Sequence, residues 1–302
     1  MLHITNGSIV AEQISLFAPG SKVIEWGDVL HEGPAPEGLS FADMNRVRAE
    51  FLSSLGWGGY ESILAQMQQR ETLLRANDHF TLWFEEDLFD QLHVLQILDC
   101  LAGRKKLQIS LVWIPQGVRA EELGAFHAAR RTIREDLLMA GGAGWKAFCS
   151  PTPKQLLRYL KTDAAKIPHL SRALVRHLQE YPSKRTGLSR TERQILEALT
   201  DGPATPHQVF AASQSREESY YMGDSTFWLY MHRLSPLLDG FAIGQLTAPV
   251  SINPMGREVF EGRQDWIQHA GIDRWLGGVH LQGQSAGWRW DDATKSLITS
   301  TN

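Results

Sequence analysis

The chain has very little cysteine. Its 302 residues include only Cys100 and Cys149, which lie far apart. Neither cysteine stands in a spacing typical of a metal site or a redox pair, so we expect no structural zinc. A reducing compartment, the cytoplasm, is the simplest location for such a chain.

Long apolar runs are also missing. No run reaches the roughly 18 residues that a membrane span needs. The first residues, Met1–Gly7, carry no basic segment and no long apolar stretch, so we expect the first strand of a fold and not a signal peptide. The hydrophobic content of 43% and the charged content of 21% are typical of a soluble globular protein. We therefore predict no membrane partner.

Several well-marked site motifs are absent as well. The sequence has no HExxH pair, no P-loop and no GxGxxG fingerprint. These absences exclude the most easily recognised zinc peptidases and nucleotide-binding loops. A site, if present, must be inferred from the placement of polar residues.

Charge is unevenly spread, although the net charge is only −4. Residues 1–100 hold 15 Asp or Glu against 5 Lys or Arg, whereas residues 154–193 hold 10 Lys or Arg against 3 Asp or Glu. Two explanations stay open. The basic segment binds an anionic partner such as a nucleic acid, or it docks on the acidic part of the chain.

Strand and helix patterns alternate over the first 115 residues. Helical patterns cover residues 8–17, where Ser8 is a candidate cap, then 41–75 with a break near Gly56–Gly59, and 88–101. The predicted strands are Leu2–Thr5, Lys22–Trp26, Phe80–Phe84 and Leu107–Ile114. This alternation predicts an α/β fold, a mostly parallel sheet with helices on both faces.

Further along the chain we expect helices. Residues 119–140 read as one amphipathic helix carrying Arg130, Arg131 and Arg134, which the glycines of 141–144 close. We divide the chain into an α/β domain at 1–150 with an acidic crevice, a basic helical connector at 151–187, and a winged-helix-like domain with a C-terminal hairpin at 188–302. Tyr181–Gly187 is the expected boundary.

The last part shows three helical patterns followed by short strands, which is the order of a winged helix. Ser189 and Glu192 form a capping box for the first helix, and the third covers 225–234. Phe227 and Trp228 are expected to be mostly buried. Gly271–His280 and Trp288–Trp290 are expected to form a hairpin packed on another domain.

A family resemblance covers nearly the whole chain. The matching segments are His3–Ser8, Trp26–Pro34, Trp83–Gln91, Leu188–Arg193, Met222–Asp224 and Gly271–His280. In this order they resemble the bacterial domain-of-unknown-function family numbered eighteen thirty-five. The resemblance implies a two-part architecture and no particular activity. The family more often has an acid at the position of Ser8.

Acidic residues follow the predicted strands. The carboxyl ends of parallel strands meet at one edge of a sheet, where ligands bind. We therefore expect one solvent-accessible crevice lined by Asp28, His31, Glu32, Glu86, Asp87 and Asp90. Of these, the oxygen ligands for a divalent cation such as Mg or Mn are Asp28, Glu32, Glu86 and Asp90. Plain helix capping and solvation is the alternative explanation for the acids.

Two further roles can be assigned at the same edge. His31, Asp87 and Asp90 are the candidate catalytic residues, as acids or bases. Asn6, Gly7 and Ser8 are candidate cofactor-binding residues, whose backbone N–H groups face a phosphate at a helix N-terminus. An ordinary tight turn with a cap is the alternative for these three.

Three functions from different classes fit these residues. The first is a cation-assisted hydrolase or transferase acting on a phosphorylated or nucleotide-like small molecule. The second is a winged-helix DNA-binding regulator that senses a ligand, and the third is a scaffold without catalysis. The aromatic content of residues 225–234 favours core packing over DNA reading. The sequence does not predict an oligomeric state.

Overall fold

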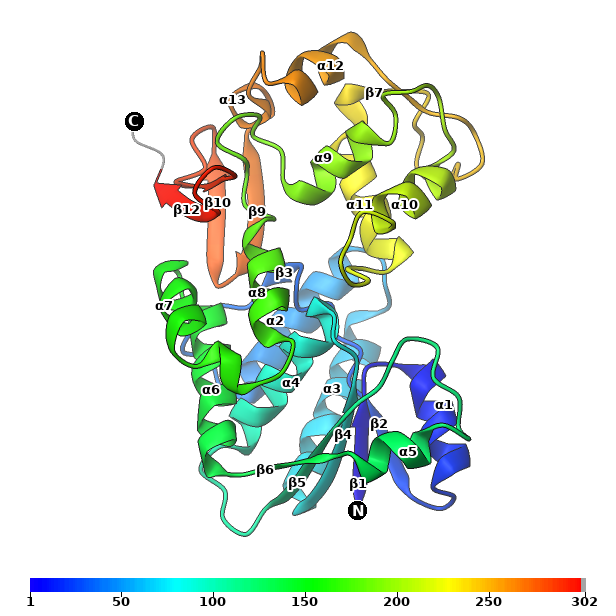
Figure 1. The fold of residues 1–302 in the computed structure, drawn as a ribbon, viewed down its shortest axis with the longest axis vertical. Coiled ribbons are helices and arrows are strands. Elements are labelled where there is room, and N and C mark those ends of the chain that lie inside the picture. The colour runs from blue at the N-terminus through cyan, green and yellow to red at the C-terminus, as the bar shows by residue number, and fades with distance from the viewer. Residues whose placement is uncertain (300–302) are drawn as a thin grey trace. The chain divides into compact units, whose positions relative to one another are not determined.

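The structure is a computed structural model that describes residues 1–299. The chain divides into two compact units (Figure 1). Unit 1 runs from Met1 to Leu174 and includes Trp275–His280, whereas unit 2 comprises Val175–Arg274 and the chain from Leu281 onward.

Unit 1 contains the large sheet and most of the long helices. Its elements are β1 (Leu2–Thr5), α1 (Ser8–Phe17), β2 (Lys22–Glu25), β3 (Gly33–Pro34), α2 (Phe41–Ser54), α3 (Tyr60–Arg75), β4 (His79–Phe84), α4 (Leu88–Leu101), β5 (Gln108–Trp113), α5 (Leu123–Ala128), β6 (Arg131–Ile133), α6 (Glu135–Cys149), α7 (Lys154–Thr162) and the 3₁₀ helix η1 (Ala164–Lys166). Three more elements belong to both units, namely α8 (Leu170–Leu178), β9 (Ile272–Gly277) and β10 (Val279–Gly283).

The large sheet has the strand order β2-β1-β4-β5-β6. Its first four strands run parallel, and β6 pairs antiparallel with β5. The prediction of an α/β fold with a mostly parallel sheet is therefore confirmed. All four predicted strands form, and their observed bounds differ from the predicted ones by at most one residue at either end.

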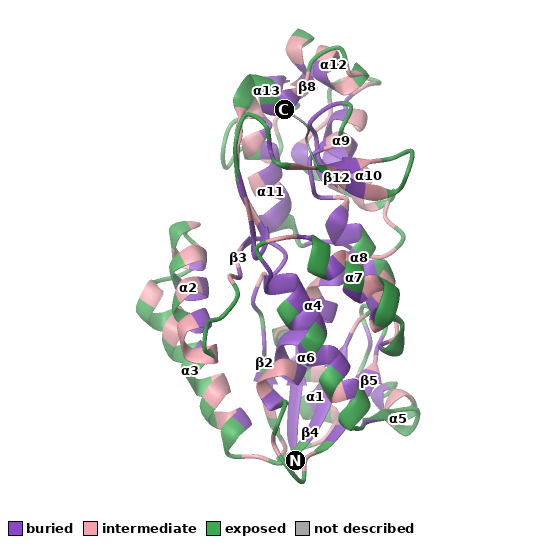
Figure 2. Cartoon of the chain, turned by 90° about the vertical axis from the view of Figure 1, so that its left-hand side faces the viewer, coloured by how far each residue is buried: buried purple, intermediate pink, exposed green. Residues whose placement is uncertain are grey.

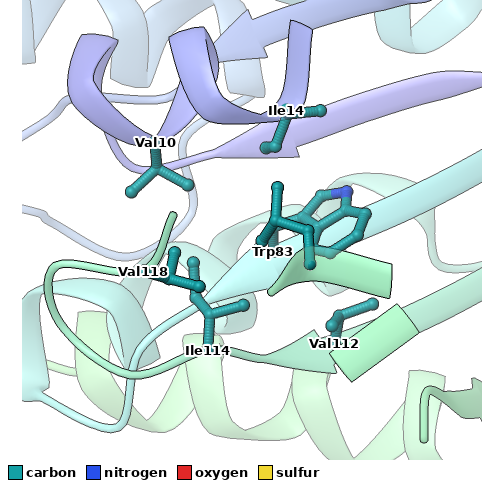
Figure 3. Packing of buried hydrophobic residues seen from close by; sticks show 7 residues of the cluster. Val10, Ile14, Trp83, Val112, Ile114 and Val118 are labelled. Carbon is teal, nitrogen blue, oxygen red and sulfur yellow. The ribbon is translucent and has the colours of Figure 1, made fainter. Parts of the chain in front are cut away.

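Apolar side chains cover both faces of this sheet. Trp83 of β4 points toward Val10 and Ile14 of α1 (Figure 3), and the same cluster includes Leu123 at the start of α5. Successive side chains of a strand point to opposite faces. The next residue, Phe84, accordingly contacts the ring of His93 on α4, at 6.0 Å between ring centroids.

Helix α4 is buried along nearly its whole length, whereas α3 is largely exposed (Figure 2). Helix α6 packs closely against α4 through glycines. A Cβ atom on Gly141 would lie 2.4 Å from Leu98, and one on Gly144 would lie 2.8 Å from Leu95. These glycines therefore permit close helix packing within α6, and the prediction that they close a helix is wrong.

The predicted single helix over residues 119–140 is also wrong. The structure has α5 and strand β6 there, and α6 begins only at Glu135. Ile133 and Thr132 pair with Ile109 and Ser110 of β5, so an edge-strand partner decides the conformation of this segment. Helical periodicity could not reveal that partner.

Ser8 does not cap α1, contrary to the prediction. The N-cap residue is Gly7, and no side chain accepts a hydrogen bond from the first turn. Ser8 is instead the first helical residue and is exposed. The N-terminus of α1 therefore keeps backbone N–H groups that no side-chain cap satisfies.

A small three-stranded sheet of order β10-β9-β3 joins distant parts of the sequence. Gly33 and Pro34 pair parallel with Leu276 and Gly277. At the turn between β9 and β10, a Cβ on Gly278 would lie only 1.7 Å from the backbone oxygen of Cys149. This turn therefore requires glycine at position 278.

Unit 2 is built from short helices and hairpins. Its elements are α9 (Arg190–Glu197), α10 (Pro206–Gln214), α11 (Asp224–Arg233), the 3₁₀ helix η2 (Ser235–Leu237), β7 (Leu238–Asp239), β8 (Ser251–Ile252), α12 (Pro254–Glu261), α13 (Trp266–Ala270), β11 (Trp288–Asp291) and β12 (Ser296–Thr299). The predicted capping box of Ser189 and Glu192 is present at α9. Phe227 is buried and Trp228 is mostly covered, so the prediction that both are mostly buried is confirmed.

A buried carboxylate organises the centre of unit 2. Glu180 accepts hydrogen bonds from Arg176 at 2.7 Å and from Thr191 at 2.6 Å. Its second oxygen accepts from Tyr230 at 2.8 Å and from Arg274 at 3.1 Å. Burial by itself raises the pKa of Glu180, but Arg176 and Arg274 outweigh it and hold this pKa well below its usual range.

Several basic residues of the segment 154–193 form ion pairs with acidic residues of their own unit. Arg176 also contacts Glu217 at 2.8 Å, and Arg190 contacts Glu217 at 3.1 Å. Arg172 lies 2.8 Å from Glu86. These ion pairs support an intramolecular role for the basic residues. No helix among the described residues has the length and apolar character needed to cross a membrane.

The buried network gives a stability prediction. Glu180→Ala should lower the free energy of unfolding by about 3–5 kcal/mol, because two buried arginines lose their shared carboxylate. Urea unfolding of the full chain measures this change. Glu218 is exposed and serves as the control. The free energy of unfolding after Glu218→Ala should stay within about 0.5 kcal/mol of that of the unsubstituted protein. A loss below about 1 kcal/mol for Glu180→Ala would contradict the assignment.

Candidate functional site

The strand order of unit 1 creates a point where two loops diverge. The chain leaves β1 for β2 on one side, and it leaves β4 for β5 on the other side. Because β1 and β4 are parallel neighbours, their carboxyl ends lie side by side while their following helices cover opposite faces. Ligands of open α/β sheets bind at such a switch point.

A hydrogen-bonded cluster joins the two loops at this switch point. One carboxylate oxygen of Asp90, on α4, accepts a hydrogen bond from the backbone N–H of Glu85 at 2.5 Å. The same oxygen accepts from the side-chain amide of Asn6 at 3.2 Å. Asp90 is fully buried, so it positions the loops and does not itself face solvent.

Asp87 begins helix α4. Its carboxylate accepts a hydrogen bond from the backbone N–H of Asp90 at 3.0 Å, as an N-cap residue does. The side chain of Gln91 donates to the backbone oxygen of Glu85 at 2.9 Å. The local sequence thus places three acids around one helix N-terminus.

Burial changes the protonation of these acids. Desolvation, reinforced by the charge of Asp87, raises the pKa of Glu85 to about 7. Desolvation also raises the pKa of Asp87 to about 6, although hydrogen bonds from the backbone of Asp90 and Phe89 oppose the change. Burial and Asp87 raise the pKa of Asp90 well above its usual range. With pKa values of about 7 and about 6, Glu85 and Asp87 exchange protons close to neutral pH.

Two polar atoms of the cluster have no hydrogen-bond partner within residues 1–299. They are the second carboxylate oxygen of Asp90 and the amide oxygen of Gln91. Both side chains are fully buried. An unsatisfied buried polar atom lowers the free energy of unfolding by roughly 1–3 kcal/mol, so this cluster destabilises the fold.

The predicted cofactor-binding residues lie beside the same cluster. Asn6 contacts Asp90, and Gly7 is the uncapped N-cap residue of α1. A Cβ atom on Gly7 would meet nothing within 4 Å, so the approach to the first turn of α1 is open. The structure therefore brings Asn6 together with Asp90, and Gly7 and Ser8 follow Asn6 at the start of α1.

The loop after β2 is organised differently. Asp28 accepts three hydrogen bonds from the guanidinium of Arg48, at 2.8, 3.1 and 3.2 Å. Arg48 also donates to the backbone oxygens of Val29, Glu32 and Pro34 at 2.8, 2.8 and 3.2 Å. This buried arginine ties the loop to α2. Asp28 is thus neutralised by a cation of the chain itself.

Histidines of this region are buried. His93 donates from Nε2 to the backbone oxygen of Asp28 at 2.6 Å, and burial lowers the pKa of His93 to about 3. His31 is only 1% exposed and packs its ring edge-on to Phe89. Its ring is shielded from solvent, and the catalytic role of His31 stays a prediction.

The remaining predicted residues separate. Glu86 is exposed and pairs with Arg172 at 2.8 Å and with His169 at 3.3 Å. Glu32 is fully buried. The predicted crevice is therefore not one solvent-accessible pocket, because Asp28, His31 and Asp90 have at most 3% of their surface exposed.

The predicted cation site does not assemble either. Within residues 1–299, no three His, Cys, Asp or Glu side chains are grouped so that they could hold a metal ion. Asp28 and Glu86 each pair with an arginine, which removes their charge from a shared site. The donor set Asp28, Glu32, Glu86 and Asp90 thus does not fit a divalent cation.

One serine lies in a sequence pattern that must be compared with its position in the fold. Gly283–Gly287 reads Gly-Gln-Ser-Ala-Gly, which matches the nucleophile elbow of α/β hydrolases. That elbow is a strand-to-helix turn, whereas Ser285 lies in the exposed connection between strands β10 and β11. The pattern therefore does not form a nucleophile elbow here.

Sequence reasoning missed two residues. Glu85 is not among the candidate residues from the sequence, although it is the half-buried acid of the cluster. A signal was present, because it is the first residue after an apolar strand. Arg48 lies in a helix far from the acids, and no local pattern indicates its contact with Asp28.

Comparison of the chain with family models and with curated proteins returned no significant match. Membership in the domain-of-unknown-function family stays a prediction from the sequence segments. The fold is that of an open α/β protein with a cluster of acidic residues at the switch point of its sheet.

The raised pKa of Glu85 gives a prediction about pH. A carboxyl whose pKa is raised in the fold stabilises the protein fully below its ordinary value near 4.5, and this stability is lost as the pH rises to about 7. The loss should be on the order of 1–2 kcal/mol, smaller than the full shift implies because Glu85 is partly exposed. Glu85→Gln should abolish this part of the pH dependence.

Urea unfolding at a series of pH values from below 4.5 to above 7 measures the effect. Glu12→Gln, at an exposed position of α1, is the matched control and should follow the unsubstituted protein. Asp87 contributes with the same sign in both proteins. Parallel curves for Glu85→Gln and the unsubstituted protein would contradict the raised pKa.

Proposed function

We propose that unit 1 binds a phosphorylated or nucleotide-like small molecule at the carboxyl ends of β1 and β4 and acts on it as a hydrolase or transferase. One observation carries the proposal. An uncapped helix N-terminus meets carboxyl groups that titrate near neutral pH at the switch point of an open α/β sheet.

The binding part rests on α1. Its N-cap residue is glycine, and its first turn contains no acidic side chain that would repel an anion. The first N–H groups of a helix have no partner within the helix, and the helix dipole favours negative charge there. The space beside Gly7 is open, so a phosphate can approach these N–H groups.

The chemical part rests on Glu85. This side chain is half-buried, so it reaches a ligand that Asp90 and most of Asp87 cannot touch. With a pKa near 7 it can accept a proton from an attacking water or hydroxyl group and return it to the leaving group. Asp87 and Asp90 act as positioning residues in this proposal. The proposed reaction uses no protein-held cation, since two of the four expected ligands, Asp28 and Glu86, are paired with arginines.

Substituting Gly7 tests the binding part. Gly7→Val should weaken binding of a phosphate ester at least about tenfold, because its side chain would occupy the approach to the α1 N-terminus. The backbone at Gly7 is extended and a Cβ there meets no neighbour, so the fold should tolerate valine. A panel of nucleotides and sugar phosphates is screened by thermal shift, and each hit is titrated by calorimetry.

The matched control is Gly59→Val. Gly59 is the N-cap residue of α3, also without a side-chain cap and without a neighbour near its Cβ position. It should bind the ligand like the unsubstituted protein. Glu85→Gln should keep binding but lose turnover. If no phosphorylated compound binds, or if both valine variants bind equally well, the proposal is wrong and the non-catalytic scaffold becomes the better hypothesis.

We further propose that α9, α10, α11 and the β7–β8 hairpin form a winged-helix-like module. Their order supports this, and so does the bridge between Ala204 and Val250, which adds a third short strand. DNA binding by this module is the second candidate function. The charges argue against it, since residues 240–249 between the strands carry no charged side chain.

The candidate recognition helix α11 also lacks exposed cations. Its exposed residues are Asp224, Ser225 and His232, and Arg233 is half-buried against the ring of Tyr230. Phosphate contacts supply most non-specific DNA affinity. We therefore expect no binding of random duplex DNA below about 10 µM at low salt, as measured by fluorescence anisotropy. Tight, steeply salt-dependent binding that Arg233→Ala removes without unfolding would favour the regulator.

A further inference from the structure

A cavity of about 460 Å³ lies in unit 1 beside β2, the edge strand of the large sheet. Its lining residues come from β2, the turn after it and one side of α3, namely Val23, Ile24, Glu25, Gly27, Gln66, Gln69, Arg70 and Leu73. Small-molecule sites typically have volumes of roughly 300–1,000 Å³. The switch-point acids do not line this cavity.

Arg70 differs from the four buried arginines, Arg48, Arg176, Arg274 and Arg289. Each of these four has a carboxylate partner, as shown by the pairs Arg48–Asp28, Arg176–Glu180, Arg274–Glu180 and Arg289–Asp265. Arg70 is half-buried, and within residues 1–299 its guanidinium makes no hydrogen bond or ion pair. Its one ring contact is with Trp26, at 5.9 Å from the guanidinium carbon to the ring centroid. Five N–H donors thus lack an acceptor from the protein.

The surroundings leave this charge poorly compensated. Desolvation lowers the pKa of Arg70, and the more distant charges of Asp28 and Glu25 offset this only in part. Shielding a cation from water without a hydrogen-bonding partner is costly. An acceptor from outside the protein would therefore gain a strong charge-assisted hydrogen bond here.

The space in front of Arg70 is kept clear by a glycine. Gly27 has a positive φ of 47°, which disfavours other residues. A Cβ atom at this position would lie 3.9 Å from a terminal nitrogen of Arg70 and 3.5 Å from the backbone oxygen of Asn6. Glycine thus leaves the guanidinium reachable from the cavity.

We propose that this cavity is a second binding site, which takes a small polar molecule through an oxyanion group held by Arg70. A guanidinium binds a phosphate or a carboxylate group through paired hydrogen bonds. The amides of Gln66 and Gln69 and the carboxylate of Glu25 bind hydroxyl or amine groups of the same molecule. This site is additional to the proposed reaction at Glu85 and does not depend on it.

Calorimetric titration with inorganic phosphate at constant ionic strength tests the site, and a parallel titration with acetate distinguishes the two oxyanions. Arg70→Met should weaken binding at least about tenfold, and Arg70→Lys should weaken it less because the charge remains. Arg75→Met is the matched control, since Arg75 lies on the same helix but is 78% exposed and paired with Glu71. It should bind like the unsubstituted protein.

Glu25→Gln should tighten binding of bare phosphate, because it removes a neighbouring negative charge. No binding of either anion, or equal binding by Arg70→Met and Arg75→Met, would overturn the inference. The Gly7→Val variant separates this site from the α1 N-terminus. If Gly7→Val abolishes phosphate binding and Arg70→Met does not, the anion binds at α1, and the proposed function stands while this inference fails.

Discussion

The hydrogen bonds of Asp90 determine how the candidate site is built. One buried carboxylate oxygen receives the backbone N–H of Glu85 and the side-chain amide of Asn6, so a residue on α4 fixes the loops after both β4 and β1. Because those strands are neighbours in a parallel sheet, the loops begin side by side, and Asp90 holds the two loops together. The uncapped N-terminus of α1 follows the first of these loops, and the half-buried Glu85 lies in the second.

The acids of unit 1 occupy two opposite kinds of environment. Asp28 is buried with the guanidinium of Arg48, which also binds three backbone oxygens, so its loop is held rigidly and its charge is neutralised. At the switch point no cation of residues 1–299 pairs with Glu85, Asp87 or Asp90, and burial raises the pKa of each. The first arrangement stabilises a loop. The second costs stability and leaves carboxyl groups able to exchange protons, which is typical of functional sites.

Unit 2 contains a buried acid that is neutralised by arginine, as Asp28 is in unit 1. Glu180 is buried, and two arginines, a threonine and a tyrosine satisfy both of its oxygens. Basic residues that looked available to an anionic partner are mostly paired, and the β7–β8 loop has no charge. Two candidate positions for an outside anion lie in unit 1, at the α1 N-terminus and at Arg70.

The sequence by itself determined the parallel strands, the long helix α4 and the placement of acids at the carboxyl end of β4, because these follow from local periodicity and from the neighbours of each residue along the chain. Tertiary structure decided the rest. The pairing of Asp28 with Arg48, the separation of Glu86 from Asp90, and the glycines buried within α6 depend on contacts between distant residues. Burial also set the protonation of Glu85, since desolvation depends on everything packed around a group and not on its neighbours in sequence.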